Sequence, residues 1–241
     1  MEGTALQVAR QAAMELGLPA PTELVTSQEA TSIQLLGLMQ AAGNELVMAF
    51  DWEFLNKTHI ITSVADVGTY PAPTDYARML NQTLWDYGNR RPAYGPVSPQ
   101  GWQVLTNALI SVGPFARYRI ARGLVEFLPV PRGDGHVFDY QYISDGWVRD
   151  WQNPTVYKAF ITNDLDVVTF DFWMMVKFLK LKMWQAKGFD TSNYTADFTR
   201  VFDAVTGQDH GAPVLGLANS FKTPWLTMYN VPDGNWNTGA L

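Results

Sequence analysis

Two aspartates one residue apart, Asp164 and Asp166, form the acidic pair of this sequence that is best placed for chemistry. Successive side chains of a strand point to opposite faces, so this alternation would set both carboxylates on one side. Such a pair could bind a hard cation or share acid and base roles. Because no further acidic ligands follow at fixed spacing, a role in a loop or at the entry of a helix is the alternative.

The rest of the sequence gives little support to an enzyme. It contains no G-x-S-x-G nucleophile motif and no Walker A loop, and its three histidines are isolated. The absence of cysteine excludes disulfides, zinc-thiolate sites and thiol catalysis. We therefore predict no catalytic residue, no metal site and no cofactor. Glycosidase carboxylates come from distant chain positions, so a cell-wall-degrading enzyme that uses carboxylates remains an alternative.

Basic residues are too few to indicate tight nucleic-acid binding. Seventeen Lys and Arg stand against 23 Asp and Glu, a net charge of −6, whereas nucleic-acid affinity comes mainly from neutralised phosphates. Lys177, Lys180 and Lys187 share one arc of a predicted helix and could form either a phosphate-facing stripe or a solvated edge. We expect DNA to pass this protein without being held.

Helical periodicity predicts long helices near residues 28–50, 170–187 and 193–205. The middle of the chain has short β-rich runs and two short helices, one after Pro73 to about Tyr87 and one from Ser98. The Gly- and Pro-rich run 129–135 separates two strand patterns, which predicts a hairpin connection.

These elements predict an α+β fold, a helical bundle with an inserted β-rich region and an extended C-terminal tail. The bundle would comprise residues 1–56 and 167–206, the insertion 57–166 and the docking tail 207–241. Charges interrupt the most apolar stretch, so no membrane association is expected.

The predicted helix 170–187 is apolar on two sides. One side carries Trp173, Met174, Leu181 and Trp184, opposite a second apolar row. A helix with two apolar sides lies either at the centre of a bundle or in an interface with another subunit. We therefore predict that these four residues form a subunit interface or the bundle core.

The last 36 residues hold only three full charges among many aromatic residues. Burying four aromatic side chains gains on the order of 15–25 kcal/mol. Ordering the backbone of residues 220–241 costs on the order of 20–45 kcal/mol, so this segment needs a surface supplied by its own core or by a partner. The predicted docking residues are Phe221, Trp225, Leu226, Met228, Tyr229 and Trp236.

Seven sequence pieces, taken in order, resemble the head-to-tail adaptor family of short-tailed bacteriophages, the tail-tubular-A-like proteins. The pieces are FDWEFL at 50–55, YPAPTDYARM at 70–79, GPVSPQGW at 95–102, FLPVP at 127–131, FDYQYIS at 138–144, DLD at 164–166 and WQAKGFD at 184–190. The resemblance covers roughly residues 5–205 and is carried by order and spacing.

The resemblance implies a structural protein of the virion, located at the head-tail junction after assembly in the host cytoplasm. It implies a homo-oligomeric ring, commonly of twelve subunits, between the portal protein and the tail nozzle protein, with the DNA channel at its centre. In similar adaptors the C-terminal extension reaches the portal, which would give the aromatic tail its surface. Another connector or nozzle ring component is a further alternative.

Overall fold

The computed structural model describes residues 2–107 and 116–209, and all structural statements concern these residues. They divide into two compact units. Unit 1 comprises residues 2–57, 73–80 and 142–209, and unit 2 comprises 58–72, 81–107 and 116–141. Each unit is considered separately below.

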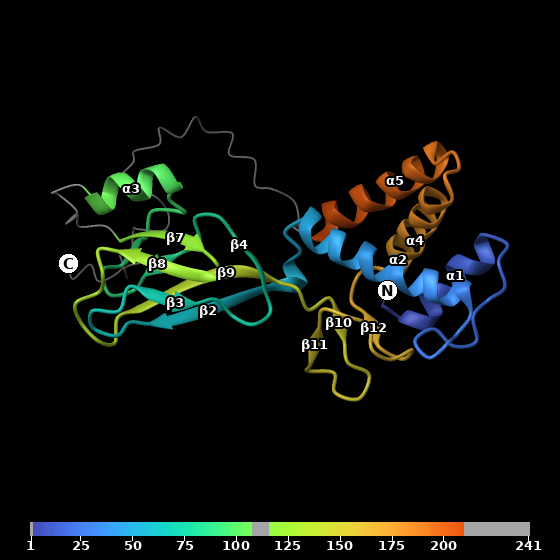
Figure 1. Cartoon of the computed structure of the whole chain (residues 1–241), viewed down its shortest axis with the longest axis horizontal. Coiled ribbons are helices and arrows are strands. Elements are labelled where there is room, and N and C mark those ends of the chain that lie inside the picture. Colours follow the sequence, from blue (N-terminus) through green and yellow to red (C-terminus); the bar gives the residue numbers. More distant parts are fainter. Residues whose placement is uncertain (1, 108–115, 210–241) are drawn as a thin grey trace, which may run out of the picture. The chain divides into compact units, whose positions relative to one another are not determined.

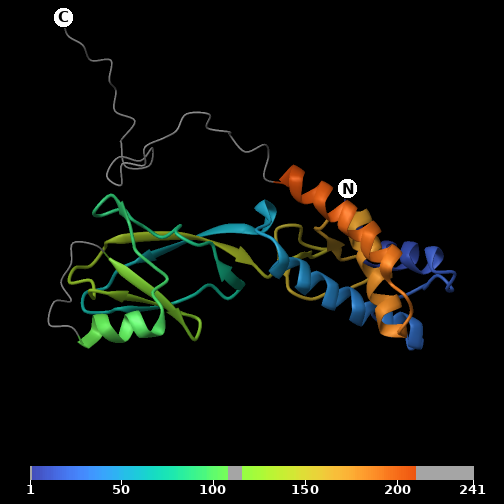
Figure 2. The ribbon, with the colours of Figure 1, turned by 90° about the horizontal axis from the view of Figure 1, so that it is seen from above.

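The helices of unit 1 surround α4. They are α1 (Ala5–Glu15), α2 (Ala30–Ala49), α4 (Phe172–Lys187) and α5 (Ser192–Asp209), with the 3₁₀ turn η1 (Glu53–Leu55) after α2. Helix α4 packs against α1, α2 and α5, and the four helices stay grouped in both views (Figure 1, Figure 2). Both apolar sides of α4 are therefore largely covered within the unit.

Local sequence explains the ends of these helices. The hydroxyl of Thr4 accepts a hydrogen bond from the backbone N–H of Gln7, and the Gln7 side chain accepts one from the Thr4 backbone, which completes a capping box at α1. Asp171 caps α4 by accepting from the backbone amides of Trp173 and Met174. Gly188 ends α4 in the left-handed conformation, with φ of 74°.

Unit 1 also contains a four-stranded antiparallel sheet beside its helices. Its strand order is β1-β12-β10-β11, with bounds Gly3–Thr4 for β1, Val148–Arg149 for β10, Tyr157–Lys158 for β11 and Val167–Val168 for β12. Trp147 precedes β10 and is completely buried against α2. A Cβ at Gly43 would lie 2.3 Å from Cζ2 of Trp147, so only glycine fits there.

Unit 2 is built on antiparallel strands that alternate buried and exposed residues. Strand β8 (Leu124–Leu128) buries Val125 and Phe127, because period-two alternation turns every second side chain inward. The Phe127 ring lies 4.6 Å from that of Phe138, between ring centroids. The three-stranded sheet has the order β3-β8-β7, with β3 at Thr69–Pro71 and β7 at Arg117–Ala121. Helix α3 (Pro99–Asn107) also belongs to this unit.

The third sheet has five strands. Its order is β2-β9-β5-β6, and β4 also pairs with β9. The bounds are Asn56–Thr62 for β2, Tyr76–Met79 for β4, Trp85–Asp86 for β5, Arg91–Pro92 for β6 and Val137–Ser144 for β9.

The predicted fold class, a helical bundle with one β-rich insertion, is wrong. The described residues form three antiparallel sheets of twelve strands together with five α-helices. The bundle segments themselves take part in a sheet, since β1 and β12 pair with each other in unit 1. Strands of two residues are too short for the alternation that reveals a strand in a sequence.

Two local predictions are also wrong. The helix expected from Pro73 to about Tyr87 is replaced by β4 and β5, which both pair with β9. The run 129–135 is not a hairpin connection, because β8 pairs with β3 and β7 whereas β9 pairs with strands of another sheet. In both places long-range strand pairing overrides a local pattern.

Candidate functional site

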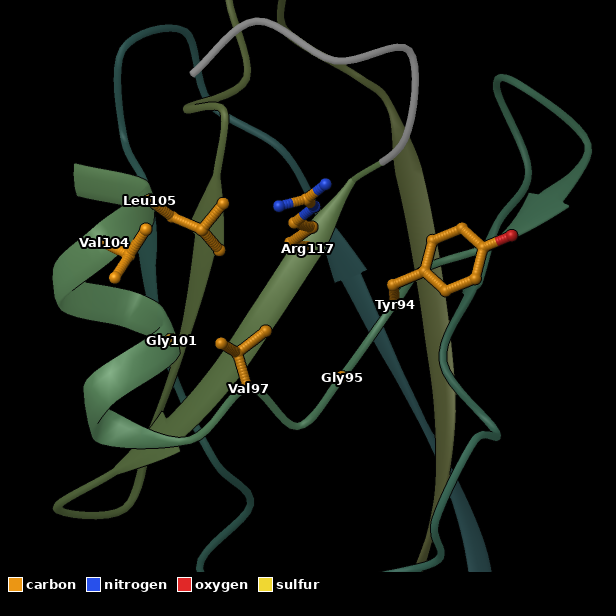
Figure 3. Close-up of a pocket in the computed structure, with 7 residues that line it drawn as sticks. All are labelled: Tyr94, Gly95, Val97, Gly101, Val104, Leu105 and Arg117. Atoms are coloured by element: carbon orange, nitrogen blue, oxygen red, sulfur yellow. The ribbon is translucent and has the colours of Figure 1, made fainter. Parts of the chain in front are cut away.

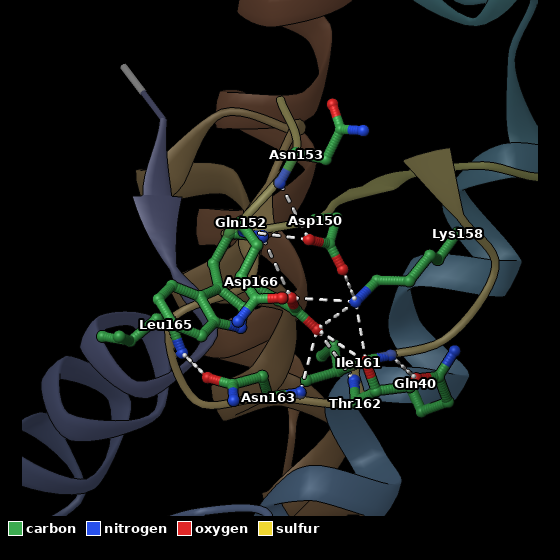
Figure 4. Close-up of polar contacts among 11 residues, drawn as sticks. Gln40, Asp150, Gln152, Asn153, Lys158, Ile161, Thr162, Asn163, Leu165 and Asp166 are labelled. Atoms are coloured by element: carbon green, nitrogen blue, oxygen red, sulfur yellow. Dashed lines mark hydrogen bonds and ion pairs between the residues drawn. The ribbon is translucent and has the colours of Figure 1, made fainter. Parts of the chain in front are cut away.

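A partly buried polar cluster in unit 1 fixes the segment between β10 and β12 (Figure 4). The Lys158 ammonium group lies 2.8 Å from Oδ2 of Asp150 and 2.8 Å from Oδ2 of Asp166. It also donates to Oγ1 of Thr162 at 2.7 Å. The Lys158 side chain on β11 thus links Asp150, Thr162 and Asp166, which lie at three different positions along the segment.

Asp166 is the centre of this cluster, with a completely buried side chain. Its Oδ2 accepts hydrogen bonds from the backbone amides of Thr162 and Asn163, each at 2.9 Å. Burial disfavours the charged form, but the hydrogen bonds from Lys158 and these amides outweigh it and lower the pKa of Asp166 below the usual value of an aspartate. The carboxylate is therefore ionised, paired and hydrogen-bonded.

Asp164 lies in the same loop but serves a different contact. Its carboxylate accepts hydrogen bonds from the backbone amides of Leu24, at 3.1 Å, and Val25, at 2.7 Å. Its own backbone carbonyl accepts from the amide of Leu6 at the start of α1. Asp164 and Asp166 thus fix two different chain segments and do not form one acidic site, which favours the loop role over the cation or acid–base pair.

The described ranges contain no cluster of three or more His, Asp or Glu side chains that could hold a metal ion. Within the same part of the chain, no helix has the length and apolar character needed to cross a bilayer.

The lysines of α4 form neither a phosphate stripe nor a solvated edge as a group. Lys180 is nearly buried, and its ammonium group lies 2.6 Å from Oε2 of Glu15. Lys177 lies 3.8 Å from carboxylate oxygens of both Glu15 and Asp197. Lys187 alone of the predicted three is exposed, in the last turn of α4.

A second carboxylate pair in unit 1 also has a structural role. Asp75 accepts from the Lys57 ammonium group at 2.6 Å and from the hydroxyls of Tyr142 and Ser144, both at 2.9 Å. These hydrogen bonds lower the pKa of Asp75 although burial raises it. Burial and, next, the charge of Asp75 raise the pKa of Asp145. Asp75 thus fixes the start of β4 against β9, and Asp145 lies next to it as a partly buried carboxylate.

The segment from Trp151 to Leu165 exposes an unusual amount of apolar surface. Five of its large apolar side chains are exposed: Trp151, Val156, Tyr157, Phe160 and Leu165. The polar cluster of Lys158, Asp150 and Asp166 holds the backbone that carries them, so these side chains are presented on a fixed support. Exposed apolar surface on a rigid element is typical of a protein interface.

Gln40 of α2 fixes the most exposed of these side chains. Its Nε2 donates to the carbonyl of Ala159 at 2.6 Å, and its Oε1 accepts from the backbone amide of Ile161 at 3.0 Å. The Phe160 side chain between these two contacts is 59% exposed. Sequence reasoning missed both residues, because an exposed phenylalanine and a helix glutamine 120 positions away carry no local signal.

The four predicted interface or core residues of α4 occupy different environments. Met174 and Leu181 are buried in the core of unit 1. Trp184 is partly covered and stacks on Tyr194 with 5.2 Å between ring centroids. Trp173 is 47% exposed. The predicted docking residues Phe221, Trp225, Leu226, Met228, Tyr229 and Trp236 lie outside the described residues.

A shallow apolar groove lies beside α3 in the described part of unit 2 (Figure 3). It is lined by Tyr94, Gly95, Val97, Gly101, Val104, Leu105 and Arg117. Most of these side chains are apolar, with Tyr94 and Arg117 as the polar ones, so the groove offers surface for packing.

Comparison with known proteins agrees with a binding role. A search of the curated proteins finds no match to this chain. A family model described as the SU10 adaptor protein matches residues 4–214, which is most of the chain and includes both units. The family is one of structural phage adaptors, and its description names no enzyme. The chain therefore belongs to the SU10 adaptor protein family.

Proposed function

We propose that this protein is the head-to-tail adaptor of its phage. It forms a homo-oligomeric ring of twelve subunits between the portal protein and the tail nozzle protein, at the head-tail junction of the virion. The ring is assembled in the host cytoplasm and surrounds the channel through which DNA passes. The membership of an adaptor family over residues 4–214 is the observation that carries this proposal.

The charges of the chain support a channel that does not retain DNA. The described part of unit 1 carries 17 Asp and Glu residues against 10 Lys and Arg. Several of those lysines are already paired with carboxylates, among them Lys158, Lys180 and Lys182. Few cations remain to neutralise phosphates, so nucleic acid binds weakly.

The exposed apolar residues support assembly with other proteins. Phe160 and its neighbours are held on a fixed backbone, and Trp173 adds an exposed aromatic ring on α4. Aromatic side chains dominate the energetics of protein interfaces. We assign Trp173 to a contact with the neighbouring subunit and the tail residues 221–241 to the portal.

Removal of residues 221–241 tests the portal assignment. The shortened chain should keep the urea midpoint of the full chain, because unit 1 and unit 2 retain all their described residues, but it should no longer co-sediment with portal rings. A full-length Trp225→Ala, Trp236→Ala double variant should also lose binding. Co-sedimentation of the shortened chain equal to that of the full chain would show that the tail does not dock there.

A further inference from the structure

One arc on the outward side of helix α2 carries no charged residue along its length. At about 100° per residue, Ala30, Ile33, Gly37, Ala41, Asn44 and Met48 share an arc of about 80°. All six are exposed, with Ile33 at 53% and Met48 at 62%. The opposite side of the helix packs into the core of unit 1 through Leu35, Met39, Ala42 and Leu46. We call the six exposed residues the α2 outer face.

An uncharged outward side is unusual for a helix on the surface of a globular unit, where polar and charged residues normally face water. Glu45, which lies beside the α2 outer face, is directed to α4, where the Lys182 ammonium group donates to its Oε1 at 2.6 Å. Asn44 has a partner inside unit 1, because its Oδ1 accepts from Nε1 of Trp147 at 3.1 Å. Among the described residues, a Cβ built on Gly37 meets nothing within 4 Å, so packing there does not require glycine. The contacts of the described residues also do not account for the exposure of the apolar side chains of Ile33 and Met48.

Phe160 extends the same surface. The Gln40 side chain leaves α2 next to the outer face, one turn after Gly37, and holds the backbone on both sides of Phe160. The result is an uncharged, mostly apolar helix face, with an aromatic side chain on a fixed backbone at its border. Small residues at the centre of this face allow another protein surface to approach closely, and the aromatic side chain of Phe160 beside them can anchor it.

The charges on unit 1 indicate which protein binds the α2 outer face and Phe160. Unit 1 has an excess of acidic residues, so two copies of it repel each other wherever their charged surfaces meet. The α2 outer face has no charged residue and lets a second acidic copy approach without such repulsion. It also offers no cation to a nucleic acid. A ring further requires one patch on each subunit to meet a different patch on the next.

We propose that the α2 outer face and Phe160 bind the neighbouring copy of this chain. This inference rests on the proposed ring, and it identifies the surface through which one subunit contacts the next. The contact is heterologous, because the α2 outer face of one subunit covers a different surface of its neighbour. We assign that second surface to the exposed side of α4 that carries Trp173.

Gly37→Glu in the full chain tests this contact. The new side chain enters open space, and glutamate favours a helix more than glycine does, so the monomer should fold at least as well as the original. The matched control is Gly207→Glu, at an exposed helical glycine of α5 where an added Cβ also meets nothing within 4 Å. Self-association is measured by sedimentation velocity over a wide concentration range and by mass photometry on portal rings.

The inference predicts that Gly37→Glu raises the apparent Kd of self-association at least about tenfold, while Gly207→Glu leaves it unchanged. If the original chain forms the ring and the Gly37→Glu variant assembles equally well, the inference is overturned but the proposed function is not. Normal self-assembly with lost binding to portal or nozzle assigns the face to that component and also overturns it. If the original chain stays monomeric at every concentration and on portal rings, ring formation fails together with the inference.

Discussion

The ammonium group of Lys158 lies 2.8 Å from Oδ2 of Asp166, whose side chain is completely buried. Breaking a buried pair leaves an uncompensated charge, which costs more than the pair itself contributes. Because the same lysine also binds Asp150 and Thr162, the order of the whole 150–166 segment depends on it.

Lys158→Met should therefore lower the free energy of unfolding by about 3 kcal/mol, measured by urea denaturation at pH 7. The control is Lys187→Met, at an exposed lysine in the last turn of α4, which should cost at most about 1 kcal/mol through the helix dipole. Equal small losses in both variants would show that the polar cluster does not support the segment.

The pH dependence of stability at acid pH should reflect the ionisation of Asp166. Its pKa is lowered in the folded state, so its contribution to stability is complete above the pKa of an unfolded aspartate and is lost as pH falls through the lower folded pKa. Urea midpoints measured between pH 7 and pH 3 should fall most steeply at the acid end. Asp166→Asn should be less stable at pH 7 and show a shallower acid slope; a slope equal to that of the original chain would contradict this assignment.

Asp145 should behave in the opposite way. Burial and the neighbouring Asp75 raise its pKa, so the folded state gains stability as pH falls through that raised value. Asp145→Asn removes an unfavourable charge and should raise the free energy of unfolding at pH 7 by up to about 1 kcal/mol, because the site is partly solvated. Asp139→Asn, at a carboxylate of unit 2 that accepts from the Tyr87 hydroxyl, serves as a comparison. Destabilisation by Asp145→Asn at neutral pH would refute the repulsion between Asp75 and Asp145.

The substitution Phe160→Ser should weaken self-association while leaving the stability of the fold nearly unchanged. The ring is more than half exposed, so the free energy of unfolding should change by about 0.5 kcal/mol or less. Loss of an aromatic anchor from the contact should weaken self-association by about tenfold or more. Phe189→Ser, at an exposed ring after α4, is the matched control. Equal self-association of the two variants would remove Phe160 from the contact.

The sequence allowed only part of this structure to be predicted. Strand β8 could be read from its alternation, because Val125 and Phe127 point inward at every second position. The sheet within unit 1 could not, because β1 and β12 have two residues each and are defined by pairing across the chain. The same holds for the candidate site. Exposure of Phe160 depends on Gln40, and the role of Asp166 depends on Lys158, and neither contact leaves a local pattern.

Assembly of the full chain on portal rings tests whether this protein forms the connecting ring. Cryo-electron microscopy of the purified chain mixed with portal rings should show one closed ring of twelve adaptor subunits on the portal, with α2 of each subunit at the boundary to the next. Portal rings without added density, or with single unconnected copies of this chain, would contradict the account.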